Sequence, residues 1–192
     1  LLFILAPLAS VFVNSSFREI TSAAFEPEIV DSIWLTLWTS MTITFICALA
    51  AVPFAYLLAR KKIPLKGIIT GIIDLPIVIP HSAAGIALLN VLARSSPLGK
   101  AAEKLGFSFV GTSLGIMIAM GFVSLPHLIN AARDGFAAVP EHLERAALNL
   151  GASPARVFFT ISLPLAKRAI VSGLVLMWAR GMREFGAVLI IA

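Results

Sequence analysis

The sequence predicts an all-α membrane protein in which several helices cross the bilayer and pack into a bundle. Hydrophobic residues make up 59% of the chain and charged residues only 13%, whereas charged residues make up about 25% of an ordinary soluble domain. The mean hydropathy is +0.97. Long apolar segments alternate with polar ones, and lipid favours helices for such segments because a helix satisfies its own backbone hydrogen bonds. We expect residues 1–192 to form a single transmembrane domain, cut from a longer chain at both ends.

The first two apolar segments are residues 1–13 and 32–59. Residues 1–13 are too few to cross a hydrocarbon core of about 30 Å, which takes roughly 20 residues, so we interpret them as the inner part of a first membrane helix. A signal-peptide core is the alternative, but no basic run precedes it and no convincing cleavage site follows. Trp34 and Trp38, one helical turn apart, are expected to be interfacial anchors. Pro53 predicts a kink.

Basic residues orient the remaining segments. Residues 67–92 and 110–132 form the third and fourth apolar segments, and the fifth covers 169–192. Alternation across the bilayer gives one side nine Lys and Arg residues in its connections and the other side four. The richer side holds Arg60, Lys61, Lys62, Lys66, Arg133, Arg145, Arg156, Lys167 and Arg168, and the poorer side holds Arg18, Arg94, Lys100 and Lys104. The positive-inside rule makes the richer side cytoplasmic.

The longest ordered polar interruption, residues 133–168, predicts a helix, a turn and a second helix on the cytoplasmic side. Residues 141–150 have the period of a short helix, and Pro140 suits its first turn. One face of this helix consists of Leu143, Ala147 and Leu150. Gly151 follows at a position where a left-handed residue often ends a helix. Ser153-Pro154 has the chemistry that begins another one.

The spacing within this interruption resembles the EAA loop of the membrane subunits of binding-protein-dependent ABC importers. That family has Glu-Ala-Ala, three residues, Gly, nine residues and Ile-x-Leu-Pro. The corresponding positions here are Arg145, Ala146, Ala147, Gly151, Ile161, Leu163 and Pro164, with every spacing kept. One position departs, because Arg145 stands where the family has Glu, and Glu144 stands just before it. The alternative is an ordinary amphipathic loop helix with no partner.

The resemblance implies a type I importer permease whose loop carries a coupling helix, seated in a groove of a cytoplasmic ATPase subunit. The residues that it assigns to this contact are Glu141, Leu143, Glu144, Arg145, Ala146, Ala147, Leu150, Gly151 and Pro164. The chain has no Gly-rich phosphate loop of the G-x-x-x-x-G-K-[ST] kind. We therefore expect ATP and Mg²⁺ to bind the partner subunit, and this chain to bind no cofactor and to have no enzymatic activity alone.

A second group of polar residues lies within the apolar segments. Residues 74–82 place two prolines and an acid where a lipid-facing helix would have none. An ionised Asp at membrane depth costs at least about 2.5 kcal/mol unless it is paired or solvated, so we expect Asp74 to pair with Arg180 or Arg183. Such a pair would either line a transport path or be merely structural. The expected gate residues are Asp74, Pro76, Ile79, Pro80, His81, Ser82, Arg180, Arg183, Glu184 and Gly186.

Residues 74–81 and 184–187 also look like the molybdate/tungstate branch of these permeases, with the sulfate/thiosulfate branch as a near neighbour. The similarity covers residues 32–192. It implies a homodimer of permease subunits in the lipid of the cell membrane, two ATPase subunits, an external binding protein that delivers the oxyanion, and alternating access. We expect residues 74–82 to form an apolar gate against the second copy, and no tight oxyanion site, because the run lacks convergent donors.

Other kinds of membrane protein fit parts of the pattern. An ion-coupled secondary transporter or channel also uses broken helices and buried charges, but we find no convincing internal repeat. A passive anchor for a soluble subunit would not explain the prolines and buried charges. His81, His127 and His142 lie on different segments without metal-ligand spacing. We expect neither a metal site nor a nucleic-acid partner.

Overall fold

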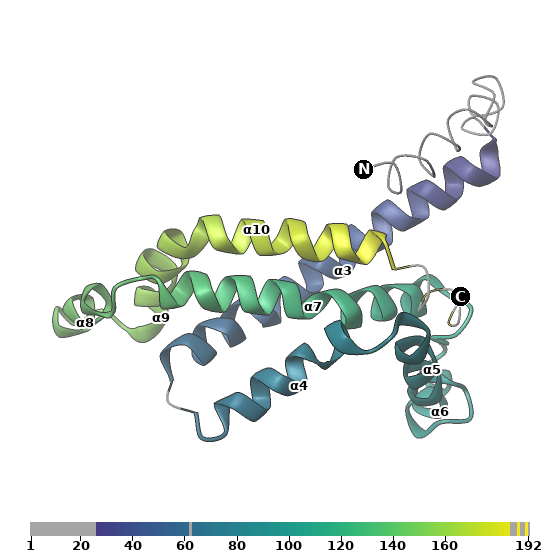
Figure 1. Ribbon diagram of the computed structural model, residues 1–192, viewed down its shortest axis with the longest axis horizontal. Helices are drawn as coiled ribbons and strands as arrows, with labels where there is room; N and C mark the ends of the chain where they lie inside the picture. Colours follow the sequence, from purple (N-terminus) through teal and green to yellow (C-terminus); the bar gives the residue numbers. More distant parts are fainter. Residues whose placement is uncertain (1–25, 62, 185–187, 189–190, 192) are drawn as a thin grey trace, which may run out of the picture. The chain divides into compact units, whose positions relative to one another are not determined.

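The computed structural model describes residues 26–61, 63–184, 188 and 191. Its helices are α3 (Pro27–Arg60), α4 (Lys66–Val78), α5 (His81–Leu92), α6 (Pro97–Lys104), α7 (Ser113–Ala137), α8 (Glu141–Asn149), α9 (Pro154–Val157), a π-helical turn η1 (Phe158–Ser162) and α10 (Leu163–Met182) (Figure 1). The described residues contain no β-strand, which confirms the all-α class. The chain divides into two compact units, Leu1–Trp38 and Thr39–Ala192.

Within the described residues, three helical stretches are long and apolar enough to cross a membrane: Pro27–Arg60, Ser113–Ala137 and Pro154–Met182. A bent pair, α4 with α5, is a fourth candidate. These helices confirm a multi-pass membrane protein. The expected first segment, residues 1–13, lies outside the described residues. In the first unit, Trp34 and Trp38 are exposed, as anchors in a membrane interface would be.

The third apolar segment is two helices and not one. Helices α4 and α5 are bent by 112° at their break. Ile79 has φ −69° and ψ 133°, the extended conformation that a following proline favours. Pro76, by contrast, lies inside α4. Of the two prolines in this segment, only Pro80 ends the helix.

Polar connections hold more helix than their composition suggested. The expected outer loop, residues 93–109, contains α6, which begins after Ser96. The Ser96 side chain caps this helix by accepting a 2.9 Å hydrogen bond from the Gly99 N–H. The interruption at 133–168 is shorter than expected, since α7 runs on to Ala137 and α10 begins at Leu163.

The core of the second unit is the seam between α7 and α10, which run side by side (Figure 1). Small residues set their separation. A Cβ atom added to Gly135 of α7 would lie 2.4 Å from the Ala169 Cβ of α10, so the helices approach as closely as glycine allows. The fully buried side chains around this seam include Leu58, Leu128, Phe136 and Met177.

The seam yields a stability prediction. Gly135→Ala should destabilise the protein by about 1–3 kcal/mol, because the added methyl group forces α7 and α10 apart. The matched control is Gly71→Ala in α4, where an added Cβ meets nothing within 4 Å. Thermal unfolding in detergent measures both variants. Equal midpoints for the two variants would show that the seam can relax at no cost.

Candidate functional site

The loop helix α8 is close to its predicted bounds. It covers Glu141–Asn149, with Leu150 as the C-cap residue. Pro140 lies just before the helix as its N-cap residue, with φ −63° and ψ 122°, and not in the first turn as we expected. Gly151 has φ +89°, which confirms the left-handed turn. The Ser153 side chain accepts a hydrogen bond from the Arg156 N–H at the start of α9, also as predicted.

The Glu144 carboxylate of α8 is the centre of a hydrogen-bonded cluster. Arg60, the last residue of α3, donates from Nε at 2.9 Å and from Nη2 at 2.8 Å to Oε1. Ser162, the last residue of η1, donates to the same oxygen at 2.7 Å. Tyr56 of α3 donates to Oε2 at 3.2 Å. Arg60 Nη2 also donates to the Val139 carbonyl at 2.8 Å. We call Tyr56, Arg60, Glu144 and Ser162 the Glu144 cluster.

The cluster connects three parts of the chain through a nearly dry ion pair. The side chains of Arg60 and Glu144 are each only 10% exposed. A buried carboxylate without partners is costly, but four hydrogen bonds satisfy this one. Helix α8 is therefore tied to the end of α3 and to the start of α10 and cannot leave them without abandoning a buried charge.

The protonation of Glu144 reflects the same contacts. Burial alone raises the pKa of its carboxyl, but the hydrogen bonds from Arg60, Ser162 and Tyr56 and the charge of Arg60 outweigh burial, so the pKa lies below its usual value. A lowered folded-state pKa means that the ionised form stabilises the fold.

Aromatic packing reinforces the cluster. The Tyr56 ring meets Phe136 of α7 edge to face, with centroids 5.2 Å apart, and meets Phe158 of η1 at 5.0 Å. The turn η1 is π-helical, an irregularity that is frequent at functional sites. Tyr56 thus packs against two elements while its hydroxyl group binds a third.

The exposed residues of α8 include leucines beside polar and charged side chains. Leu143 and Leu148 are exposed and Leu150 is 89% exposed, whereas Ala147 is half-buried. A short helix that exposes several leucines and buries one carboxylate has the form of a docking element. Three of the residues that the sequence assigned to the contact, Leu143, Ala147 and Leu150, lie near one another on this helix.

Arg145, which stands where the family has Glu, does not occupy the buried position of the helix. Arg145 is exposed and forms an ion pair with Glu141 of the same helix, 2.6 Å between Nη2 and Oε2. Glu144 is the buried carboxylate of the helix. Of the assigned residues, Ala146 is exposed on α8, and Pro164 lies in the first turn of α10.

The predicted pairing of Asp74 is wrong. Its carboxylate accepts a 2.6 Å hydrogen bond from the side-chain amide of Asn130 in α7, and among the described residues neither Arg180 nor Arg183 forms an ion pair with it. A neutral amide can satisfy one oxygen of a half-buried acid without burying a second charge. The contact fastens α4 to α7 just before the break.

Other predicted gate residues meet at the break between α4 and α5. His81 begins α5, and its ring contacts Arg180 and Glu184. Arg180 and Glu184, four residues apart, also form an ion pair, at 3.7 Å. Ile79 packs against a small apolar cluster that includes Ala84 and Val123. Ser82 follows His81 in α5, Arg183 is the C-cap residue of α10, and Gly186 lies outside the described residues.

Sequence reasoning missed four residues of these sites: Tyr56, Arg60 and Ser162 around Glu144, and Asn130 beside Asp74. Arg60 was visible as the first base after an apolar segment, and a polar Asn130 within the fourth segment was a signal of the same kind. Ser162 gave no signal, because nothing in a sequence tells which of several serines will face a distant carboxylate.

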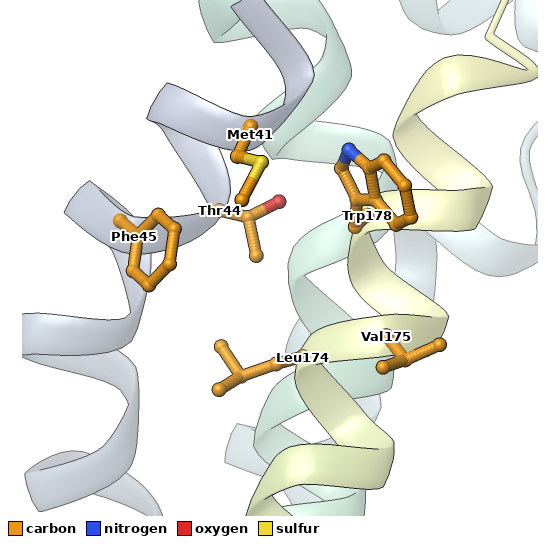
Figure 2. Close-up of a pocket in the computed structure, with 6 residues that line it drawn as sticks. All are labelled: Met41, Thr44, Phe45, Leu174, Val175 and Trp178. Carbon is orange, nitrogen blue, oxygen red and sulfur yellow. The ribbon is translucent and has the colours of Figure 1, made fainter. Parts of the chain in front are cut away.

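An apolar pocket of about 170 Å³ lies between α3 and α10 (Figure 2), lined by Met41, Thr44, Phe45, Leu174, Val175 and Trp178. The Thr44 hydroxyl group already donates its hydrogen bond to the Ser40 carbonyl, so the hydroxyl hydrogen is not available to a ligand. The apolar lining of the pocket suits a hydrocarbon group and does not suit an anion. Among the described residues, no group of three or more His, Cys, Asp and Glu side chains could hold a metal ion.

Removing the Glu144 carboxylate should release α8. Glu144→Ala leaves Arg60 buried without its partner, and such losses cost about 3–5 kcal/mol. The control is Glu141→Ala, which breaks an exposed pair worth on the order of 0.5 kcal/mol or less. Hydrogen exchange of the α8 amides measures both. Protection that falls equally in the two variants would mean that the buried cluster does not hold the helix.

The pKa of Glu144 predicts an acid limit for the same contact. Because the folded-state pKa is lowered, the contribution of Glu144 is complete above the ordinary value of about 4.3 and is lost as the pH falls through the folded value. Protection of α8, corrected for intrinsic exchange, should stay level from neutral pH to about 5 and fall below about 4. Glu144→Gln should remove this fall. The same fall in that variant would assign it to another acid.

Known proteins similar in sequence to this chain are membrane subunits of transport systems. Residues 51–192 match the family described as "Binding-protein-dependent transport system inner membrane component". The chain is 40% identical over 194 residues to the molybdate/tungstate transport system permease protein WtpB of Pyrococcus abyssi, which covers 100% of this chain and 73% of the relative. The protein of the same name from Thermococcus kodakarensis is 41% identical over 99% of this chain and 72% of its own length. The probable sulfate transport system permease protein cysT of Chlorokybus atmophyticus is 34% identical over 92% of this chain and 62% of its own length. The chain belongs to the family of inner membrane components of binding-protein-dependent transport systems.

Proposed function

We propose that this chain is the translocating subunit of an ATP-driven importer of tetrahedral oxyanions, with molybdate and tungstate as substrates. The observation that carries the proposal is helix α8, which exposes Leu143 and Leu148 while its Glu144 is held by α3 and η1. The names of relatives that cover nearly all of this chain support the choice of substrate. Sulfate is the second candidate, supported by the similarity to a probable sulfate permease.

In this proposal the loop with α8 is cytoplasmic and docks on a separate ATPase subunit, which binds ATP and Mg²⁺. Two ATPase subunits would approach each other when they bind ATP, and each would carry the docked α8 with it. The Glu144 cluster would transmit the movement to the ends of α3 and α10, because the cluster joins all of these elements by direct contacts.

Helix α10 provides a mechanical connection to the gate. Its first turn follows Ser162, and Arg180 in its last turn contacts His81 at the break between α4 and α5. A rigid helix of 20 residues transmits displacement over about 30 Å. The proposed gate is the end of α4, where Leu75, Ile77 and Val78 are exposed, Val78 by 81%. These side chains would meet those of a second copy and exclude water.

Uptake by the reconstituted transporter tests the function. The permease, its ATPase and its external binding protein in proteoliposomes should accumulate labelled molybdate only when ATP is present on the side of the ATPase. Tungstate should compete at lower concentration than sulfate. Stronger competition by sulfate than by tungstate would indicate that the protein is a sulfate permease. Uptake driven by an ion gradient without ATP would contradict the ABC mechanism.

The docking face makes a prediction about assembly. Ala147→Trp should weaken co-purification of the ATPase, because a large side chain on α8 prevents close approach to the groove. Ala101→Trp, at an exposed position of α6, is the matched control and should leave co-purification unchanged. Full recovery of the ATPase with the Ala147 variant would place the docking face elsewhere.

The gate makes a prediction about cross-linking. Single cysteines at Leu75, Ile77 and Val78, on a Cys47→Ser background, should cross-link between two copies in one nucleotide state and much less in the other. The reason is that alternating access separates the two α4 ends in one of its states. Cross-linking that is the same with and without trapped nucleotide would show that this run is a static interface.

A further inference from the structure

Three polar side chains meet where the end of α10 reaches the break between α4 and α5. Arg180 Nη2 lies 3.1 Å from Nε2 and 3.4 Å from Nδ1 of His81. His81 Nδ1 lies 3.3 Å from Oε2 of Glu184. Arg180 Nη1 lies 3.7 Å from the same oxygen, beyond ordinary hydrogen-bond distance. We call these residues the Arg180 triad.

The chemistry of the groups assigns the protons. A guanidinium group can only donate, so His81 Nε2 must accept from Arg180 with its lone pair. His81 Nδ1 is then the ring nitrogen nearest the Glu184 carboxylate, at a charge-pair distance of 3.3 Å. Among the described residues, the contacts of the Arg180 guanidinium group with His81 come from Nη2, whereas Nη1 has only the ion pair with Glu184 at 3.7 Å. Arg180 therefore retains donors that could bind a forked acceptor.

Burial within the triad is uneven. The Glu184 side chain is 1% exposed, whereas Arg180 is 24% and His81 is 47% exposed. The acid is thus inside and the two nitrogen-bearing groups face outward. An anion that approaches from outside the protein meets the guanidinium and the imidazole before it meets the carboxylate.

We propose that Arg180 and His81 form a transient acceptor for the tetrahedral oxyanion, which replaces Glu184 as their partner. Two oxygens of such an anion match the fork of a guanidinium group, and the Nδ1 edge of His81, which now faces Glu184 at 3.3 Å, would donate to a third oxygen. The inference rests on the proposed function and adds a site to it.

Two further features fit this exchange. His81 begins α5, and the Pro80 N-cap provides no side-chain hydrogen bond to the first turn, so the positive end of the helix dipole adds to the attraction. Glu184 competes with the anion for the same groups, which keeps the affinity low. A transport path must release its substrate, and a site of low affinity, where Glu184 competes with the anion, allows that release.

The rival explanation is a structural latch, in which the triad only holds the break closed. Both charges would then matter equally, and two amides could replace them. The experiment uses the complete transporter in proteoliposomes, with labelled molybdate and labelled sulfate as probes. The variants are Arg180→Gln, Arg180→Lys, Glu184→Gln and the double variant with glutamine at both positions. Uptake is measured beside the ATPase activity that the loaded binding protein stimulates.

Arg180→Gln should lower uptake about tenfold or more while stimulated ATPase activity stays normal, because at least one charge-assisted hydrogen bond to the anion is lost. Arg180→Lys should recover part of the uptake, and Glu184→Gln should lower it much less than Arg180→Gln. The double variant should be as poor as Arg180→Gln. Equal losses in both single variants with recovery in the double variant would establish the latch and overturn the acceptor.

The same measurements separate this site from the proposed function. Normal ATP-dependent uptake in the wild type together with normal uptake in Arg180→Gln would overturn the site alone. A wild type without ATP-dependent uptake would overturn the proposed function and the site with it. If Glu184→Gln does not assemble, Arg180→Lys decides, because partial recovery supports the acceptor and uptake as low as in Arg180→Gln overturns it.

Discussion

The carboxylate of Glu144 is the contact on which the organisation of the loop depends. It accepts hydrogen bonds from Arg60, Ser162 and Tyr56, and its ion pair with Arg60 is nearly excluded from water. Breaking one member of such a cluster strands a charge, which costs far more than the pair contributes when it is intact. A nine-residue helix that would be marginal by itself is thereby fixed to the ends of two membrane helices.

Helix α8 buries one carboxylate, Glu144, against the chain's own helices, where Arg60, Ser162 and Tyr56 donate to it. Its leucines Leu143 and Leu148 and the C-cap Leu150 are left uncovered by the part of the chain that the structure describes. An external groove that buried these leucines would gain hydrophobic energy without disturbing the cluster.

The membrane sets different conditions at the break between α4 and α5. A helix broken at Pro80 leaves backbone groups that lipid cannot satisfy, so the break needs protein or water around it. Polar side chains gather there: Asn130 holds Asp74, and Glu184 and Arg180 meet His81. The charges are arranged in pairs or with neutral partners, so the region can be polar without large uncompensated charge.

Composition and period were enough to predict the class, the apolar stretches that form α3, α7 and α10, helix α8 and the left-handed Gly151, because these follow from local chemistry. The spacing of the loop motif was enough to indicate the family. The contact partners of polar side chains were harder to predict, because those partners lie far away in the sequence. Asp74 was assigned an arginine because charge suggested it, but the packing of α7 beside α4 brings Asn130 there instead. The role of Glu144 was also hidden, since Glu141 and Glu144 look alike in sequence and only packing against Arg60 separates them.

Under the proposed function, the number of oxyanions transported for each ATP hydrolysed is the measurement that tests the role of the Glu144 cluster most directly. The complete transporter would carry Glu144→Gln, which keeps the shape of the side chain but not its charge, with Glu141→Gln as the matched control. We predict that ATP is still hydrolysed in the Glu144 variant while transport per ATP falls about tenfold or more, as expected when a charged hydrogen-bond network between two moving parts is lost. The control should keep the wild-type ratio. An unchanged ratio in an assembled Glu144→Gln transporter would contradict the claim that this carboxylate transmits movement from α8 to the membrane helices.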